Sequence, residues 1–304
     1  MKKTSFIAFT LCFLMASMFA EKKLSIAVTF DAMEELTKAV VKDLADVSLI
    51  IPEGMEPHEA EPTPQNLIFL SNADVLIYNG FGMEFYLEKV LKATNNKNLV
   101  LVEATKGIKP IMIEEDHDED HEEEEEHESH HHHHHGNIDP HAWLSLQSAR
   151  VMVKNIGISL SKLDKKNAKE YNKNANLYIK QLDKLYSEYA KKIKNLKNKN
   201  LVASHAAFAY LCRDFGLMQN SITDVFAEGE PNAKQLVALV EYCKKHNVKT
   251  IFSEEVANQA LAQTLSSEVG GKVVKIYTIE TKEDDMSYLK RMEENLKRIY
   301  ENLK

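Results

Sequence analysis

Short runs of β-branched and apolar residues alternate with helix-like segments along most of this 304-residue chain. The first four runs are bounded by turn or helix signals, and helix-like sequence separates each run from the next. Strands that alternate with helices predict a mainly parallel sheet covered by helices, because each helix carries the chain back to begin the next strand. The four predicted strands are residues 23–30, 47–52, 75–80 and 98–105.

A long helical region follows. One predicted helix covers residues 145–163 and breaks at Asp164, and a second periodic run extends from about Asn167 to Leu196. A helix of about 30 residues is about 45 Å long at 1.5 Å per residue. That length spans a domain, so we expect this helix to join two of them.

The strand and helix alternation then resumes to the end of the chain. It predicts an α/β fold of two lobes, each with a mainly parallel four-stranded sheet flanked by helices, joined by the long helix. The predicted strands of the second lobe are residues 200–205, 221–226, 249–255 and 272–278. The expected division is a signal peptide at 1–20, an N-terminal lobe at 21–145, a helical region at 146–198 and a C-terminal lobe at 199–304.

The first twenty residues have the pattern of a secretory signal peptide. Lys2 and Lys3 precede a continuous apolar run, and small residues lead to a predicted cleavage after Ala20. The apolar run is too short and too thinly flanked to be a persuasive membrane span. Cys12 lacks the small-residue context of a lipidation site. We therefore expect an exported protein with no membrane insertion after cleavage.

The negative charge of the chain is concentrated in one low-complexity segment. Positions 114–135 carry twelve acids and no base, so their removal changes the formal net charge from −8 to +4. This composition cannot bury apolar surface, and we expect a disordered loop at 114–136. The rest of the chain has neither a basic stripe nor interleaved aromatic residues, which argues against nucleic acid as a partner.

Two cysteines follow the predicted cleavage site, Cys212 and Cys243. An exported protein could join them in a disulfide. Free cysteines are also often buried, so two buried thiols on neighbouring helices explain the pair equally well. Sequence spacing does not choose between these alternatives.

Four histidines lie outside the low-complexity segment: His58, His141, His205 and His246. His246 closes a predicted helix, where a cation interacts favourably with the helix dipole. His58 and His205 each follow a predicted strand, and open α/β sheets bind ligands at the carboxyl ends of their strands. Taken alone, either histidine fits a structural role better than a metal site.

His141 has a more distinctive setting. Asp139 and Pro140 fix a turn immediately before it, and Trp143 supplies a rigid apolar body beside it. Asp139 could orient the imidazole, as metal-bound histidines require, or cap a helix that begins near Leu144. Both roles are compatible.

Several motifs in this order resemble the zinc-binding, ZnuA-type members of the periplasmic metal-binding proteins that serve ABC importers. The motifs are PHEAEPTP, the acidic and histidine-rich insertion, NIDPHAWLS, NLVASHAAFAYLCRDFG and EGEPNAKQLVALVEYCKKHNVKTIFSEE. The resemblance covers essentially the whole mature chain. It implies a rigid long helix between the lobes, Zn²⁺ bound in the cleft between them, and delivery of zinc to a membrane permease by a periplasmic protein, which we expect to be a monomer.

Carried over to this chain, the three zinc histidines of the family fall on His58, His141 and His205. A histidine at the third ligand position favours zinc over manganese, because the manganese-binding relatives have a carboxylate at that position. Neutral imidazoles suit tetrahedral zinc at about 2.0–2.1 Å. The fourth ligand stays open between Glu280, Glu59, Glu254 and water, since the sequence after the last strand departs from the family's usual aspartate-containing turn.

The histidine run precedes His141, and we expect it to collect zinc more weakly than the cleft, because ordering a flexible chain opposes binding. Its histidines are His117, His121, His127, His130, His131, His132, His133, His134 and His135.

Two other function classes stay open. One is a zinc hydrolase with Glu59 as general base, although the chain has no HExxH helix or nucleophile elbow. The other is a surface adhesin, which the missing lipid-attachment cysteine disfavours.

Overall fold

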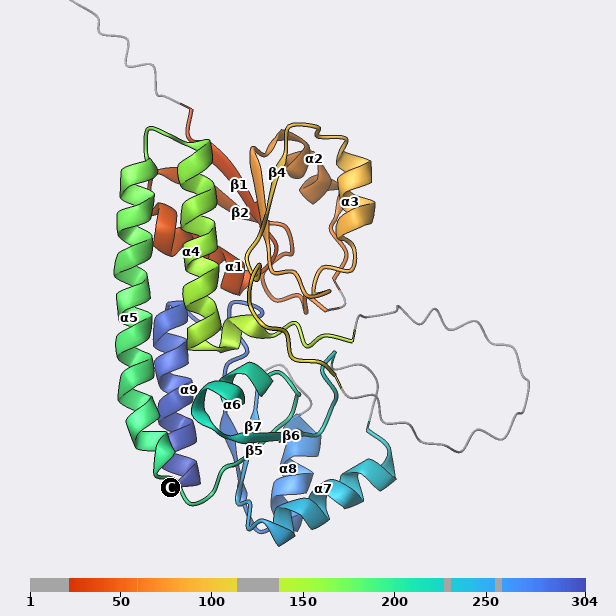
Figure 1. Ribbon diagram of the computed structural model, residues 1–304. Helices are drawn as coiled ribbons and strands as arrows, with labels where there is room; N and C mark the ends of the chain where they lie inside the picture. Colours follow the sequence, from red (N-terminus) through yellow and green to blue (C-terminus); the bar gives the residue numbers. More distant parts are fainter. Residues whose placement is uncertain (1–21, 59, 114–136, 227–230, 255–258) are drawn as a thin grey trace, which may run out of the picture.

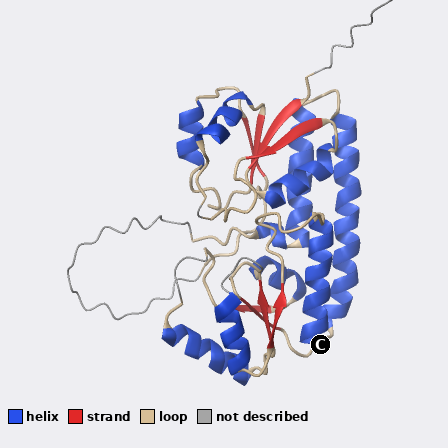
Figure 2. Ribbon diagram, turned by 180° about the vertical axis from the view of Figure 1, so that it is seen from behind, coloured by secondary structure: helices blue, strands red, loops and turns tan. Residues whose placement is uncertain are grey.

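The computed structural model describes residues 22–58, 60–113, 137–226, 231–254 and 259–304 (Figure 1). The predicted signal peptide, Glu59 and the acidic and histidine-rich segment lie outside the described residues. Two sheets, one above the other in Figures 1 and 2, lie beside a layer of long helices.

The first sheet has the strand order β2-β1-β3-β4, and every neighbouring pair is parallel. Thr63 caps the second helix of this lobe through a capping box, and Pro64 occupies its first position, where a missing N–H costs nothing. The elements are β1 (Leu24–Val28), α1 (Asp31–Val41), β2 (Ala45–Leu49), α2 (Pro64–Asn72), β3 (Val75–Tyr78), α3 (Leu87–Thr94) and β4 (Val100–Glu103).

The second sheet repeats this arrangement with the order β6-β5-β7-β8, again parallel throughout. Asn232 begins its first long helix with a second capping box. The elements are β5 (Asn200–Ala203), α6 (Ala209–Phe215), β6 (Met218–Ser221), α7 (Ala233–Lys245), β7 (Thr250–Ser253), α8 (Gln259–Glu268), β8 (Lys272–Lys275) and α9 (Tyr288–Leu303). The predicted pair of parallel four-stranded sheets is confirmed.

Between the sheets, the short 3₁₀ helix η1 (Ala142–Leu144) leads into α4 (Leu146–Leu163), which packs against α5 (Ala168–Lys194). The 27 residues of α5 extend about 40 Å, and Figure 1 shows this helix passing both sheets. Gly157 lets the two helices approach closely, because a Cβ there would lie 2.9 Å from the Cβ of Ala175. The break at Asp164 is also present, since Asp164 accepts hydrogen bonds from Asn167 and Tyr171.

One hydrophobic core continues through both lobes. Alternate strand residues such as Val28 and Ala203 face the shared cluster, which includes α1, α4, α5 and α9. Their neighbours Ala27 and Val202 face two smaller clusters on the opposite faces of the sheets, beneath α2 and α3 and beneath α7 and α8. Because protein interiors are close-packed, this shared core opposes free rotation of one lobe relative to the other.

The strand predicted at 221–226 is wrong in its position. The chain pairs with β5 from Met218 onward, directly after Gly216 ends α6 in the left-handed conformation. Only Ser221 belongs to both ranges. The β-branched residues after it misled the prediction, because polar Gln219 and Asn220 occupy the strand itself.

The alternative of a disulfide between Cys212 and Cys243 is also corrected. Both cysteines are free and buried. Cys212 on α6 belongs to the core shared by the lobes, whereas Cys243 on α7 lies in the cluster on the other face of the second sheet. The sheet therefore separates the two thiols.

Among the described residues, no helix combines the length and the apolar character needed to cross a membrane.

Candidate metal centre

Four buried side chains bring potential metal ligands together between the two sheets. His58, His141, His205 and Glu280 each offer one ligand atom, and these atoms lie within 4.8 Å of one another. His58 follows β2, His205 follows β5 and Glu280 follows β8, so three of the four lie beyond the carboxyl ends of parallel strands. His141 comes from the segment that precedes η1 and connects the lobes.

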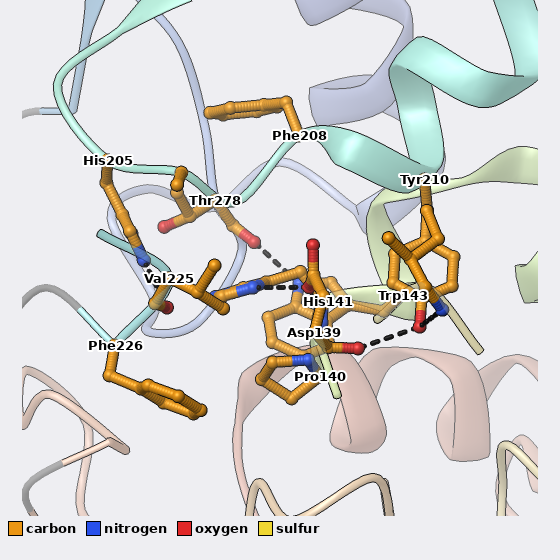
Figure 3. Close-up of polar contacts among 12 residues, drawn as sticks. Asp139, Pro140, His141, Trp143, His205, Phe208, Tyr210, Val225, Phe226 and Thr278 are labelled. Carbon is orange, nitrogen blue, oxygen red and sulfur yellow. Dashed lines mark hydrogen bonds and ion pairs between the residues drawn. The ribbon is translucent and has the colours of Figure 1, made fainter. Parts of the chain in front are cut away.

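The imidazole of His141 is fixed by Asp139. The Oδ1 atom of Asp139 accepts from the backbone N–H of His141 at 2.8 Å and lies 2.9 Å from its ring Nδ1 (Figure 3). A proton on Nδ1 donates to this carboxylate and leaves the Nε2 lone pair free for a metal. Of the two roles expected of Asp139, the structure shows the contact with the imidazole. The capping role is wrong, because Ser145 caps α4 by accepting from Ser148 N–H, and no side chain caps η1.

A second contact fixes the backbone before His141. The side-chain amide of Asn79, at the end of β3, donates to the carbonyl of Pro140 at 2.9 Å. Glu84 is buried and accepts from the backbone N–H groups of Asn79 and Gly80. Sequence analysis missed Asn79 and Glu84, because nothing local indicates that the loop after β3 meets Pro140.

Three of the four ligand atoms already have the spacing of a tetrahedral zinc site. His58 Nε2 and His141 Nε2 are 3.0 Å apart, and Glu280 Oε1 lies 3.4 Å from the first and 3.2 Å from the second. Ligands at 2.0–2.1 Å from a tetrahedral zinc ion are separated by about 3.3 Å. These three atoms therefore suit a bound cation.

Glu280 has a further feature that suits a bound cation. Its Oε1 is buried and has no hydrogen-bond partner among the described residues. An unpaired buried carboxylate oxygen is costly, and here it faces the Nε2 atoms of His58 and His141. A divalent ion at the centre of the group would satisfy all of these atoms, so the donor set of three imidazoles and one carboxylate fits zinc.

His205 is arranged differently from the other three residues. Its Nε2 lies 2.9 Å from the carbonyl of Val225 (Figure 3). Its Nδ1 lies 3.6 Å from Glu254 Oε1. Burial opposes the charged form of His205, but the carboxylates of Glu254 and Glu280 outweigh it and raise the pKa to about 10. The imidazole must lose a proton before it can bind a metal.

Two of the remaining ligands, His58 and Glu280, are already close to their metal-binding forms. Burial lowers the pKa of His58 to about 4, so its imidazole is neutral at pH 7. Burial opposes ionisation of Glu280, but the surrounding histidines hold its pKa well below the usual value. Burial opposes protonation of His141, but the carboxylates of Asp139 and Glu280 raise its pKa, so this imidazole, like that of His205, must lose a proton before it binds a metal.

The sequence left three carboxylates open as the fourth ligand, and the structure describes two of them, Glu280 and Glu254, in different places. Glu280 joins the cluster, whereas Glu254 faces His205 from outside the group of four, and Glu59 lies outside the described residues. Glu56 is a further nearby carboxylate that sequence analysis missed, although it lies two residues before His58. It accepts from the backbone N–H of His58, and burial together with Glu280 raises its pKa to about 8.

Comparison with protein families gives one match along nearly the whole chain. The ZnuA family model, described as zinc-uptake complex component A, periplasmic, matches residues 26–302. A putative metal-binding protein of Treponema pallidum is 43% identical, covering 91% of this chain and 86% of that protein. The high-affinity zinc uptake system protein ZnuA of Bacillus subtilis is 39% identical, covering 92% and 88%.

Solved structures agree with this match. The metal-dependent lipoprotein YcdH of Bacillus subtilis is 34% identical with a TM-score of 0.75, covering 92% of this chain and 99% of that one. A mutant of the laminin-binding adhesin of Streptococcus agalactiae is 28% identical with a TM-score of 0.82, covering 92% and 100%. The fold of this chain is thus shared with a protein described as a metal-dependent lipoprotein and with one described as a laminin-binding adhesin.

Proposed function

We propose, on the premise that this chain belongs to the ZnuA family of zinc-uptake components, that it captures one Zn²⁺ ion between its lobes and delivers it to a membrane permease. His58, His141, His205 and Glu280 are the proposed ligands. The observation that carries this assignment is the unpaired buried Oε1 of Glu280 opposite two imidazole nitrogens at zinc-like spacing.

The ligand set supports binding rather than catalysis. A catalytic zinc site keeps an open position for water, whereas four protein ligands close the tetrahedron. With Glu280 as the fourth ligand, zinc has no position left for a hydrolytic water. We expect no turnover of ester or peptide substrates by the zinc-loaded protein, and turnover that depends on zinc would contradict the transport assignment.

Release requires the ligands to separate. The shared core and α5 oppose a wide hinge motion, so we propose that docking on the permease displaces the loops that carry His58, His205 and Glu280. Small-angle scattering should show little change in radius of gyration when zinc is added to protein lacking residues 114–135. A large decrease would contradict this rigid-lobe mechanism.

The acidic and histidine-rich segment is proposed as an accessory zinc collector. The residues that flank it meet, since Ile113 N–H donates to Asn137 O at 3.0 Å and Met112 bridges Ile138. The described residues on either side of the segment therefore pair with each other, and Asn137 and Ile138 precede His141 by only a few residues. Uptake at limiting zinc should slow when residues 114–135 are deleted, and unchanged growth and transfer would exclude the collecting role.

The primary test is a zinc titration against a competing chelator, with protein lacking residues 114–135. We expect one tight equivalent to remain, because the proposed ligands all lie outside that segment. Loss of tight binding would move the site into the histidine run and overturn the ligand assignment.

The proposed location is the periplasm, after cleavage near Ala20. A surface adhesin remains the competing function, since the same fold occurs in the laminin-binding adhesin of Streptococcus agalactiae. Cell fractionation separates the two, because release with the periplasmic fraction excludes a surface role. Retention on the cell surface together with laminin binding would favour the adhesin.

A further inference from the structure

The Glu280 carboxylate is carried by an irregular arc, residues 277–284, between β8 and α9. Within this arc Ile279 has a φ of +58° and is completely buried. A β-branched residue rarely adopts the left-handed region, because its side chain clashes with its own backbone. The arc is therefore strained next to the proposed ligand, and surrounding contacts must hold it in place.

Two side chains of α9 hold the two ends of this arc. Asn295 accepts from Tyr277 N–H at 2.8 Å and donates to Tyr277 O at 2.7 Å. Arg291 donates to the carboxylate of Asp284 at 3.0 Å and to its backbone carbonyl at 2.8 Å. Arg291 and Asn295 are four residues apart, so they lie one helical turn apart on the same face.

Both side chains are more completely buried than is usual for arginine and asparagine. Arg291 is 1% exposed and Asn295 is 0% exposed. Arginine is almost never fully buried unless it is paired. Arg291 also donates to the carboxylate of Asp31 at the start of α1, and Asp31 N–H donates to the carbonyl of Glu280 at 3.4 Å. The arginine thus connects the end of the arc, the other lobe and the ligand residue itself.

We propose that Arg291 and Asn295 are positioning residues that hold the Glu280 carboxylate at the metal site by clamping the two ends of this strained arc. With either clamp removed, Ile279 relaxes toward a favourable backbone conformation and the carboxylate leaves the histidines. A merely structural role, in which these residues only attach α9 to the sheet, predicts lower stability without a specific effect on Glu280.

This inference rests on the proposed zinc function, and the wild-type titration separates the two. If full-length wild-type protein shows no tight zinc site, the function itself is wrong. If the tight site is present but insensitive to changes at the clamp, only the clamp is wrong.

The experiment measures zinc affinity by chelator competition for Asn295→Leu, and for Arg291→Met combined with Asp31→Asn. The combined variant removes both partners, because Arg291→Met alone would leave a buried carboxylate without its cation. We expect about 10- to 100-fold weaker binding, the usual effect of losing a residue that orients a ligand. Asn302→Leu is the matched control, since Asn302 also lies on α9 but donates only within that helix, and its affinity should equal wild type.

The same substitutions in a Glu280→Gln background decide how the clamp acts. If Asn295 acts through Glu280, Asn295→Leu should cause no further loss of affinity there, because interacting sites are not additive. Equal losses in both backgrounds would overturn the proposal. The visible spectrum of one bound Co²⁺ equivalent provides a second readout, and clamp variants should shift it toward that of Glu280→Gln rather than leave it as in wild type.

Thermal unfolding of the metal-free variants reports on folding. If Asn295→Leu does not fold, Asn295→Asp keeps the acceptor for Tyr277 N–H and replaces the donor to Tyr277 O with an acceptor oxygen. The clamp would be supported if Asn295→Asp lowers zinc affinity in the wild-type background but causes no further loss in the Glu280→Gln background. Wild-type affinity of Asn295→Asp with a lower unfolding temperature would overturn it.

Discussion

The two lobes have the same strand order but hold their metal-facing side chains by different means. In the N-terminal lobe and the segment after it, His141 is oriented by Asp139, two residues away. In the C-terminal lobe, the arc around Glu280 is held by donors from elsewhere: Gly54 N–H to Thr281, and Trp143 Nε1 to the carbonyl of Thr278. One half of the site is locally preorganised, and the other depends on contact between the lobes.

The equivalent crevices of the two sheets also differ. In each sheet the strand order reverses between the first and third strands, which is where open α/β sheets bind ligands. In the first sheet this crevice contains Asn79, which binds the backbone beside His141. In the second sheet it contains His205 and Glu254. The same topological position therefore supports a ligand in one lobe and supplies it in the other.

The strongest way to test this comparison is to remove the preorganised ligand. His141→Ala should weaken tight zinc binding by more than about 100-fold, because loss of a ligand exceeds the 10- to 100-fold cost of losing an orienting partner. Chelator competition measures the effect. His246→Ala is the control, since His246 closes α7 and lies outside the cluster. Retention of the tight site in His141→Ala would contradict the assignment.

The pH dependence of zinc binding should report the protonation of His205 in the C-terminal half of the site. Because the pKa of His205 is raised to about 10, its imidazole carries a proton at pH 7 that zinc must displace. Each displaced proton weakens apparent affinity about tenfold per pH unit as pH falls, so about 100-fold is expected between pH 8 and pH 6. His58, with its pKa near 4, should contribute nothing in this range, whereas the raised pKa of His141 adds to the dependence.

Calorimetry in buffers of different ionisation enthalpy checks this directly. We expect at least one proton to be released per zinc bound at pH 7. A pH-independent affinity with no proton release would mean that His205 is already neutral, and the contrast between the two halves of the site would disappear.

The orienting carboxylate of His141 should have the next largest effect. Asp139→Asn keeps the size of the side chain but removes the charge that fixes the proton on Nδ1. We expect zinc affinity to fall about 10- to 100-fold, with the fold preserved by circular dichroism. An unchanged affinity would show that Asp139 serves the turn alone.

The matching change in the other lobe should have the smallest effect. Glu254 Oε1 lies 3.6 Å from His205 Nδ1, beyond hydrogen-bond distance, whereas Asp139 lies 2.9 Å from His141. Glu254→Gln should therefore weaken zinc by less than the roughly tenfold minimum expected of an orienting partner. A loss as large as that of Asp139→Asn would show that both lobes orient their histidines in the same way.

Much of the architecture was predictable because its signals are local. The apolar runs before His58 and His205 overlap β2 and β5, and the order of strands and helices implies parallel sheets. Boundaries were less predictable: β6 carries Gln219 and Asn220, which have no strand pattern, and its position depends on pairing with β5. Long-range pairing overrode the local preference there.

The sequence by itself determined the two α/β lobes, the long helix and three histidines beside strand ends or a rigid turn, because each depends on periodicity or on neighbours in the chain. Only the tertiary structure decided that Glu280 lies beside the histidines while Glu254 faces His205 from outside, and that one sheet separates Cys212 from Cys243. The reason is physical. Glu280 reaches its place through a strained backbone at Ile279 and contacts to α9 and α1, and no local pattern encodes where such distant segments meet.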